Sequence, residues 1–288
     1  MCSVNNFVMK IEKVINNNIV SSTDQNGNEV VVMGKGLGYK RKAGQPIPED
    51  IVEKTFRIDN HDSMERFQDL LKNLPMEYIR LSDEIISYAK KHLDIELSET
   101  VYLTLTDHIS FIIDQCKEGK TYHNMLHEEV SRFYHDEYAV GLYALSLIEK
   151  KTGCKLPEDE AASIALHLVN AEFGMKVKDT WTMTNLMKDM LSIIEQELQI
   201  ENKDFIYKSW LTINLKFLAH RMLSLQPQQN QPDPQLLEFS KTYYSREYAL
   251  ADKIKHLVAE KYGCEITEEE KLYLVLHIGR IKDMYLLK

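Results

Sequence analysis

The stretch EKKTGCKLPEDEAASIALHLV at residues 149–169 returns as AEKYGCEITEEEKLYLVLHIG at residues 259–279, 110 positions later. The copies share, in order, a lysine, a glycine, a cysteine, a glutamate and a Leu-His pair: Lys151, Gly153, Cys154, Glu160 and Leu166-His167 match Lys261, Gly263, Cys264, Glu270 and Leu276-His277. A second block matches at an offset of 106 positions, where LTDHISF at 105–111 faces LTINLKF at 211–217. Repetition at a fixed period indicates one structural module that occurs twice.

Both modules have the apolar spacing of helices. Segments such as FQDLLKNL, IRLSDEIISYAKKHL and VGLYALSLIEKKTG carry apolar residues three and four positions apart, which is the period of an amphipathic α-helix. Gly153 and Gly263 stand where helix C-caps are expected, and LPEDE at 156–160 has the proline and acidic residues of a first helical turn. The region from about Met64 onward therefore predicts two homologous all-α helical-bundle domains, at residues 70–178 and 179–288.

The N-terminal region has the pattern of strands instead. Apolar residues alternate or run at strand length in MKIEKVI, NIVSSTD and EVVVMG, and Asn26-Gly27-Asn28 between two of these runs signals a tight turn. The glycines of GKGLGYK at 34–40 allow positive φ angles or close backbone approach, and they disfavour a helix. We predict a small antiparallel β domain of about four strands that ends near Ile58. Because a domain of this size buries little surface alone, we expect a dimer.

The composition is that of a globular chain rather than of a disordered one. Of the 288 residues, 44% are hydrophobic and 27% are charged. No apolar run approaches the roughly 20 residues needed to cross a bilayer, and the N-terminus shows no secretory signal pattern, so we expect no membrane insertion and a cytoplasmic location. The four cysteines are scattered without a CxxC pair, which argues against a disulfide framework and a zinc ribbon.

Charge is distributed unevenly along the chain. The formal net charge is −9 at pH 7, yet the segment from Lys10 to Gly44 holds six basic residues and three acidic ones. A basic segment in an acidic chain indicates contact of that segment with nucleic acid. Surplus lysines that only keep a small domain in solution are the alternative.

Three histidines lie within apolar helical stretches: His108 in TLTDHISFII, His167 in SIALHLVNA and His277 in LYLVLHIGRI. His167 and His277 are equivalent in the repeat, whereas Asn214 occupies the position equivalent to His108. A single histidine in such a place is most often a hydrogen-bonded core residue. Recurrence at matching positions indicates a shared role instead.

Several chemical roles are open to these three histidines. Together with Asp107 they could bind zinc, although no HExxH or similar spacing is present. No GxSxG motif and no recognisable cysteine setting supports a nucleophilic hydrolase. A neutral imidazole can also accept a phosphoryl group, which adds up to about two negative charges. Six other histidines lie in polar stretches, and we expect them to be solvated: His61, His92, His123, His127, His135 and His256.

The ordered motifs of the chain resemble the BglG/SacY/LicT family of transcriptional antiterminators. MKIEKVINNNIV and EVVVMGKGLGYKRKAG resemble the family's co-antiterminator RNA-binding domain, here at residues 9–64. LTDHISF, LPEDEAASIALHLVNAE, LKFLAHR and LYLVLHIGRI resemble its two PTS regulation domains. Because Met9 matches the usual start, residues 1–8 are expected to be an N-terminal extension or the result of an earlier start codon.

The resemblance implies a sugar-responsive RNA-binding regulator rather than an enzyme, with no cofactor and no metal. A dimeric β domain would bind an mRNA hairpin that overlaps an intrinsic terminator, so that transcription continues. Phosphorylation of the first regulation domain by a sugar-specific PTS enzyme II would switch the protein off, and phosphorylation of the second by HPr would support activity. The expected partners are therefore the RNA hairpin, HPr, the enzyme II and a second copy of the chain.

The resemblance also implies which residues bind RNA. A tyrosine can stack on a splayed base, asparagine amides can form hydrogen bonds with base edges, and lysines can meet phosphates. The full predicted set is Lys13, Asn16, Asn17, Asn18, Gly34, Lys35, Tyr39, Lys40 and Arg41. Without the resemblance, the Asn16-Asn17-Asn18 run would be interpreted as a turn between strands.

By the same resemblance, the phosphorylated residues are His108 and His167 in the first module and His277 in the second. Asn214 replaces the fourth family histidine, and asparagine cannot accept a stable phosphoryl group. Activation through the second module therefore depends on His277 alone, or this module has lost its requirement for phosphate. His220 follows six residues after Asn214 in a different helical register, so we do not expect it to substitute.

Two other classes of function remain open from the sequence. A DNA-binding activator with the same regulation domains needs a helix-turn-helix segment, whereas the N-terminus has strand patterns. A metal-dependent hydrolase that uses the three histidines is the other class.

Overall fold

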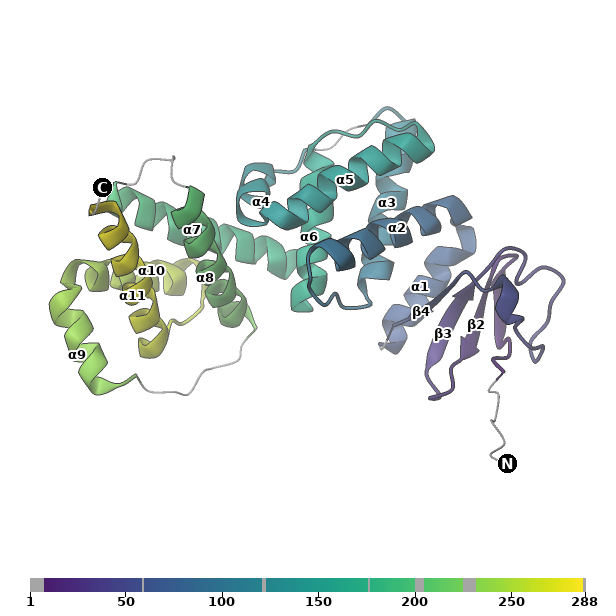
Figure 1. The fold of residues 1–288 in the computed structure, drawn as a ribbon, viewed down its shortest axis with the longest axis horizontal. Helices are drawn as coiled ribbons and strands as arrows, with labels where there is room; N and C mark the ends of the chain where they lie inside the picture. Colours follow the sequence, from purple (N-terminus) through teal and green to yellow (C-terminus); the bar gives the residue numbers. More distant parts are fainter. Residues whose placement is uncertain are drawn as a thin grey trace. The chain divides into compact units, whose positions relative to one another are not determined.

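The computed structural model describes residues 8–58, 60–120, 123–175, 177–199, 205–224 and 232–286. The chain forms two compact units (Figure 1). The first spans residues 1–127 and 134–175, and the second spans residues 128–133 and 176–288. All but the last residue of the predicted extension at 1–8 lies outside the described residues.

Four antiparallel strands form a sheet at the start of the first unit. They are β1 (Lys13–Asn16), β2 (Ile19–Thr23), β3 (Glu29–Met33) and β4 (Lys54–Arg57), which pair in the order β1-β2-β3-β4, with the short 3-10 helix η1 (Glu49–Ile51) before β4. In the β2–β3 turn, Gly27 has a φ of +82°, and the carboxylate of Asp24 accepts the backbone N–H groups of Asn26 and Asn28. The predicted small antiparallel β domain is confirmed.

The two faces of the sheet belong to two different apolar cores. Val30 and Val32 of β3 pack with Leu37 and Ile47 from the segment between β3 and β4. Val31, which lies between those valines, packs into the core that contains the helices of the first unit. Since successive side chains of a strand point to opposite faces, one face is covered by the sheet's own connecting segment and the other by helices.

The helices of the first unit extend the core of the sheet. They are α1 (His61–Asn73), α2 (Met76–His92), α3 (Val101–Lys117), α5 (His135–Thr152) and α6 (Asp159–Phe173). The ring of Phe56 in β4 lies 5.4 Å from that of Phe67 in α1 and 5.2 Å from that of Tyr102 in α3, both in edge contact. The β domain and the first set of helices therefore share one continuous apolar core.

The second unit consists of helices. They are α4 (His127–Phe133, of which residues 128–133 belong to this unit), α7 (Val177–Leu198), α8 (Phe205–Leu223), α9 (Pro234–Tyr243), α10 (Ser245–Tyr262) and α11 (Glu268–Leu286). Two ion pairs join α4 to α7, one between Arg132 and Glu195 and one between Glu129 and Lys188.

The sequence repeat forms two matching helix pairs, α5 with α6 and α10 with α11. Gly153 ends α5 and Gly263 ends α10 in the left-handed region, with φ angles of +73° and +64°. Only glycine adopts this conformation without strain, so both predicted C-caps are confirmed. The predicted fold class, a β domain followed by two homologous sets of helices, is confirmed as well.

Candidate functional sites

The loop after β3 is held against the turn between β1 and β2. The backbone N–H groups of Gly34 and Gly38 donate to the carbonyl oxygens of Asn18 and Asn17, at 2.9 and 3.0 Å. The side chain of Asn18 adds a third contact, because its Oδ1 atom accepts the N–H of Gly36 at 2.8 Å, across a separation of 18 residues. Two distant segments of the sequence therefore form one surface.

Gly38 and Gly34 are required by close approach of the backbone. A Cβ atom on Gly38 would lie 2.1 Å from the carbonyl oxygen of Asn16, and one on Gly34 would lie 1.9 Å from that of Ile51. Both distances are far inside van der Waals contact, so any side chain forces the segments apart. The sequence allows either a positive φ angle or close backbone approach at these glycines, and the structure shows close approach at both Gly34 and Gly38.

An aromatic ring and two lysines are exposed on this loop. Tyr39 is 56% exposed, and the Nζ atom of Lys40 lies 5.2 Å from its ring centroid. Lys35 is exposed on the same loop, and Asn17 is exposed on the adjoining turn. The structure therefore brings together six members of the predicted RNA-binding set: Asn17, Asn18, Gly34, Lys35, Tyr39 and Lys40.

Other members of the predicted set have contacts within the protein or lie apart from this loop. Asn16 donates from Nδ2 to the carbonyl oxygen of Leu71 in α1 at 2.8 Å. Arg41 donates from Nη1 to the carbonyl oxygen of Pro46 at 3.3 Å, and Lys13 is exposed at the start of β1. A role of these three residues in RNA binding stays a prediction.

His108 of α3 and His167 of α6 lie next to each other in the first unit. Their ring centroids are 4.7 Å apart. Glu160, in the first turn of α6, places its Oε2 atom 3.2 Å from Nε2 of His108, and the side chains of His108 and Glu160 are only 17% and 8% exposed. The structure thus joins the two predicted phosphate acceptors of the first module in one cluster with a buried carboxylate.

Burial keeps His167 uncharged. Loss of hydration lowers the pKa of His167 to about 3, and positive charge on His108 acts in the same direction. An uncharged imidazole retains the lone pair on one ring nitrogen that attack on a phosphoryl donor requires.

The lowered pKa of His167 predicts a stability that is sensitive to acid. In the unfolded chain this histidine takes up a proton near pH 6.5, whereas the folded protein keeps it neutral down to about pH 3. The unfolded state binds more protons in this window, so the free energy of unfolding falls as the pH decreases below 6.5, by up to about 1.4 kcal/mol per pH unit. We expect His167→Gln to flatten this dependence between about pH 6.5 and 5, in urea unfolding followed by far-UV circular dichroism. An unchanged slope would contradict the buried, neutral state.

The equivalent site in the second unit keeps one of the two histidines. Asn214 of α8 accepts, at its Oδ1 atom, a hydrogen bond from the hydroxyl group of Tyr273 at 2.8 Å. The ring of Tyr273 stands edge-on to that of His277, with centroids 3.9 Å apart. Burial and then the positive charge of Arg280 lower the pKa of His277. Tyr273 therefore bridges Asn214 and His277 in one site, whereas Nε2 of His220 lies 3.1 Å from Oγ of Ser224 further along α8.

Glu270, the second glutamate of the repeat, is held by the start of its own helix. Its Oε2 atom accepts the N–H of Thr267 at 2.9 Å, and its N–H donates to Oγ1 of Thr267 at 3.3 Å, which is a capping box. An ion pair joins its other oxygen to Nε of Arg221 in α8. Among the described residues, the contacts of Glu270 are therefore with Thr267 and Arg221 rather than with a histidine.

The first copy lacks this capping box for a reason that lies in the sequence. Pro157 stands at the position of Thr267, and proline has no N–H to donate to the glutamate. Glu160 is therefore not engaged in a cap, and its Oε2 atom faces His108 instead.

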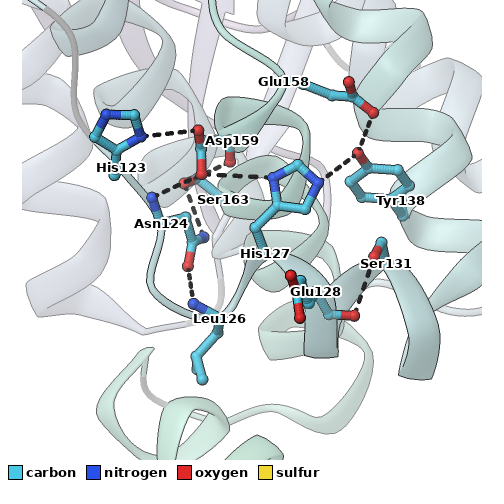
Figure 2. Close-up of polar contacts among 10 residues, drawn as sticks. All are labelled: His123, Asn124, Leu126, His127, Glu128, Ser131, Tyr138, Glu158, Asp159 and Ser163. Carbon is cyan, nitrogen blue, oxygen red and sulfur yellow. Dashed lines mark hydrogen bonds and ion pairs between the residues drawn. The ribbon is translucent and has the colours of Figure 1, made fainter.

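A further polar network fixes the first turn of α6 (Figure 2). Asp159 accepts the backbone N–H of Asn124 at 3.1 Å, and its carboxylate lies 3.3 Å from Nδ1 of His123 and 3.4 Å from Nδ1 of His127. Burial alone raises the pKa of Asp159, but these contacts hold it below its ordinary value. The segment before α4 is thus attached to the helix that carries His167.

The other ring nitrogen of His127 continues this network. Its Nε2 atom lies 3.1 Å from the hydroxyl group of Tyr138, which donates to Glu158 at 2.7 Å (Figure 2). The expectation of a solvated side chain holds only in part for His127, because contacts from α5 and α6 leave its side chain 29% exposed. His123, whose side chain is 87% exposed, agrees with that expectation.

Comparison with known proteins assigns the chain to a family. Residues 9–65 match the CAT RNA binding domain, and residues 83–171 and 188–281 each match the PRD domain. The transcription antiterminator LicT of Bacillus subtilis is 41% identical over 274 residues, which cover 95% of this chain and 99% of LicT. The chain belongs to the BglG/SacY/LicT family of transcription antiterminators.

Two further relatives of this antiterminator agree with the assignment. The β-glucoside operon antiterminator of Dickeya chrysanthemi is 37% identical over 277 residues, covering 96% of this chain and 97% of the relative. The crystal structure of GlcT CAT-PRDI matches with a TM-score of 0.51 and 29% identity, over 58% of this chain and 99% of that one. The resemblance seen in the sequence is confirmed, and the chain is an antiterminator of transcription in which a CAT RNA-binding domain is controlled through PRD domains and the phosphotransferase system.

The structure also bears on the two alternatives drawn from the sequence, the DNA-binding activator and the metal-dependent hydrolase. Within residues 8–58 of the antiterminator, the only helical segment is the three-residue η1, so these residues form no helix-turn-helix. Among the described residues, no group of three or more His, Cys, Asp or Glu side chains is placed to bind a metal ion. None of the described helices is long and apolar enough to cross a membrane.

Sequence reasoning missed the residues that surround the histidines. Glu160 and Glu270 are visible as matching positions of the repeat, but the sequence does not show that one faces a histidine and the other an arginine. The repeat does not point to Tyr273, because the equivalent position in the first copy is Ser163. Pro157, opposite a threonine in the second copy, is the one signal that points to a different role for Glu160.

Proposed function

We propose that this antiterminator acts as a cytoplasmic homodimer, without catalytic activity, that binds an mRNA hairpin overlapping an intrinsic terminator. In this proposal, a sugar-specific PTS enzyme II phosphorylates His108 and His167, and HPr phosphorylates His277. The observation that carries the RNA-binding part is the attachment of the Gly34–Lys40 loop to the Asn17-Asn18 turn, with Tyr39 exposed.

The exposed loop has the chemistry of an RNA-hairpin reader. The ring of Tyr39 offers a stacking platform for an unpaired base. Lys35 and Lys40 place positive charge on the same loop for phosphates, and such contacts make affinity fall as salt rises. Because Gly34 and Gly38 have no side chain, the loop packs directly against the carbonyl groups of Ile51 and Asn16, and this packing holds Tyr39 at the surface.

Removal of the Tyr39 ring is expected to weaken RNA binding without unfolding the protein. Tyr39→Ala loses one base-stacking contact, which is worth about 1–3 kcal/mol by alanine substitution, or roughly 5- to 150-fold in Kd. The measurement is a gel-shift titration with the antiterminator hairpin, at fixed salt. Tyr39→Phe keeps the ring and is expected to bind nearly as the parent, so it serves as the matched control. Unchanged affinity of Tyr39→Ala would refute a stacking role.

Local charge supports opposite effects of phosphate in the two modules. In the first unit, a phosphoryl group on His108 adds negative charge beside the buried Glu160 carboxylate, so repulsion disfavours the packed arrangement of α3 and α6. In the second unit, the charge of Arg280 acts on His277, and a cation there stabilises an added phosphate. Inactivation through the first module and activation through the second are consistent with these charges.

Exposed apolar side chains support the homodimer. Ile213 and Phe217 lie one turn apart on α8, and Phe239 and Tyr243 lie one turn apart on α9, and each of the four is at least half exposed. Apolar groups that gather on a surface favour association. Light scattering of the purified chain measures its mass directly, and a monomer at micromolar concentration would exclude this part of the proposal.

The relative from Dickeya chrysanthemi is named for a β-glucoside operon, and we propose a β-glucoside as the inducing sugar here. A terminator–reporter fusion in cells given β-glucosides or other sugars tests this choice. Read-through that responds equally to unrelated sugars would contradict it.

A further inference from the structure

The two histidines of the first unit turn different ring nitrogens toward the interior. Nε2 of His108 is buried and faces Glu160, whereas Nδ1 of His167 is buried and has no hydrogen-bond partner within the described chain. Both side chains are partly exposed. The remaining nitrogens, Nδ1 of His108 and Nε2 of His167, are not among the buried polar atoms that lack a partner, so we assign the exposed part of each ring to the edge that carries them.

The carboxylate of Glu160 determines which nitrogen of His108 holds the proton. At 3.2 Å from Nε2, its negative charge favours a proton on that nitrogen. In a neutral imidazole the other nitrogen then carries the lone pair. Burial of the carboxylate strengthens this preference, since water screens the charge only weakly there.

We propose that His108 accepts a phosphoryl group on Nδ1 and His167 accepts one on Nε2, with Glu160 as the positioning residue of His108. This inference rests on the proposed function in that it deepens the role of the same histidines. With phosphoramidate as the donor, the Nδ1 lone pair of His108 forms a bond to phosphorus while the P–N bond of phosphoramidate breaks. The donor nitrogen leaves with the electron pair and takes up a proton, and the Nε2 proton stays beside Glu160.

The second unit offers an internal comparison. Glu270 is engaged with Thr267 and Arg221, and Asn214 stands where His108 would be. A change at Glu160 is therefore expected to leave phosphorylation of His277 unaffected, so that His277 reports on the donor and on the integrity of the protein in the same sample.

The test uses phosphoramidate, a small donor that releases ammonia and needs no partner protein. The full chain, labelled with ¹⁵N-histidine, is phosphorylated as His167→Ala, which isolates His108, and as His108→Ala, which isolates His167. Heteronuclear NMR then identifies the nitrogen bonded to phosphorus from its shift and coupling. We expect the Nδ1 isomer on His108 and the Nε2 isomer on His167. In Glu160→Gln combined with His167→Ala, we expect a mixture of both isomers on His108 with His277 phosphorylated as before.

The outcomes separate this inference from the proposed function. The same isomer on both histidines, the reverse pair of isomers, or no reaction at either histidine would overturn the inference. If His108 still gave a single isomer in Glu160→Gln, Glu160 would not be its positioning residue. A purely structural role of Glu160 would change the yield of phosphorylated His108 but not the ratio of the two isomers. A parallel reaction with phosphorylated HPr and enzyme II tests the proposed function by itself, because failure there leaves the phosphoramidate result intact.

Discussion

Replacement of His108 and His167 together by aspartate is expected to abolish read-through of the terminator. The two rings lie 4.7 Å apart, and Glu160 lies 3.2 Å from His108, so the variant gathers three carboxylates in one largely buried cluster. Two like charges about 4 Å apart repel by about 4 kcal/mol at an effective dielectric of about 20. Repulsion of a few kcal/mol is enough to shift a two-state equilibrium by factors of hundreds.

The measurement is a terminator–reporter fusion in cells without inducer and without the sugar permease. A matched variant with glutamine at both positions has similar shape and no charge, and we expect it to give read-through at the level of the unphosphorylated protein. Far-UV circular dichroism checks that both variants remain folded. Read-through of the aspartate variant equal to that of the glutamine variant would contradict control by negative charge in this cluster.

Loss of the Arg221 charge is expected to destabilise the second unit by about 3–5 kcal/mol, the usual cost of breaking a buried ion pair from one side. Arg221→Met leaves the carboxylate of Glu270, whose side chain is only 9% exposed, without its charged partner. Both tryptophans of the chain, Trp181 and Trp210, lie in α7 and α8 of this unit. Urea unfolding followed by tryptophan fluorescence therefore reports on the second unit selectively.

A second substitution separates the charge from the capping role of Glu270. Glu270→Gln retains an acceptor for Thr267 and carries no charge, so the double variant Arg221→Met with Glu270→Gln is expected to recover most of the lost stability. A loss of less than about 1 kcal/mol in the single variant, as for a surface ion pair, would show that solvent screens this contact.

Much of the candidate site could be predicted from the sequence because it follows from local patterns. The strand alternation, the Asn-Gly turn and the two C-cap glycines depend on neighbouring residues, and each forms as expected. The repeat identifies His167 and His277 as equivalent and shows Asn214 in place of a histidine. Gly38 was restricted to two roles by the sequence, and the nearby carbonyl of Asn16 decides between them.

The partners of the histidines could not be predicted, because they are set by contacts between helices far apart in the chain. His108 and Glu160 come from α3 and α6, and Tyr273 reaches Asn214 from α11 to α8. His127 illustrates the same point, since its polar sequence surroundings indicated solvent while contacts with Tyr138 and Asp159 half-bury it. Local polarity does not report on burial that tertiary packing creates.

The amino-acid order by itself determined the duplicated helical module, the strand-built RNA-binding domain and the positions of the three histidines, since periodicity and turn chemistry act over a few residues. The tertiary structure decided which carboxylate faces which imidazole and which ring nitrogen is buried. The physical reason is distance: hydrogen bonds to a histidine act over about 3 Å and charges over about 4–6 Å, and only the packing of α3 against α6 and of α8 against α11 brings groups that close.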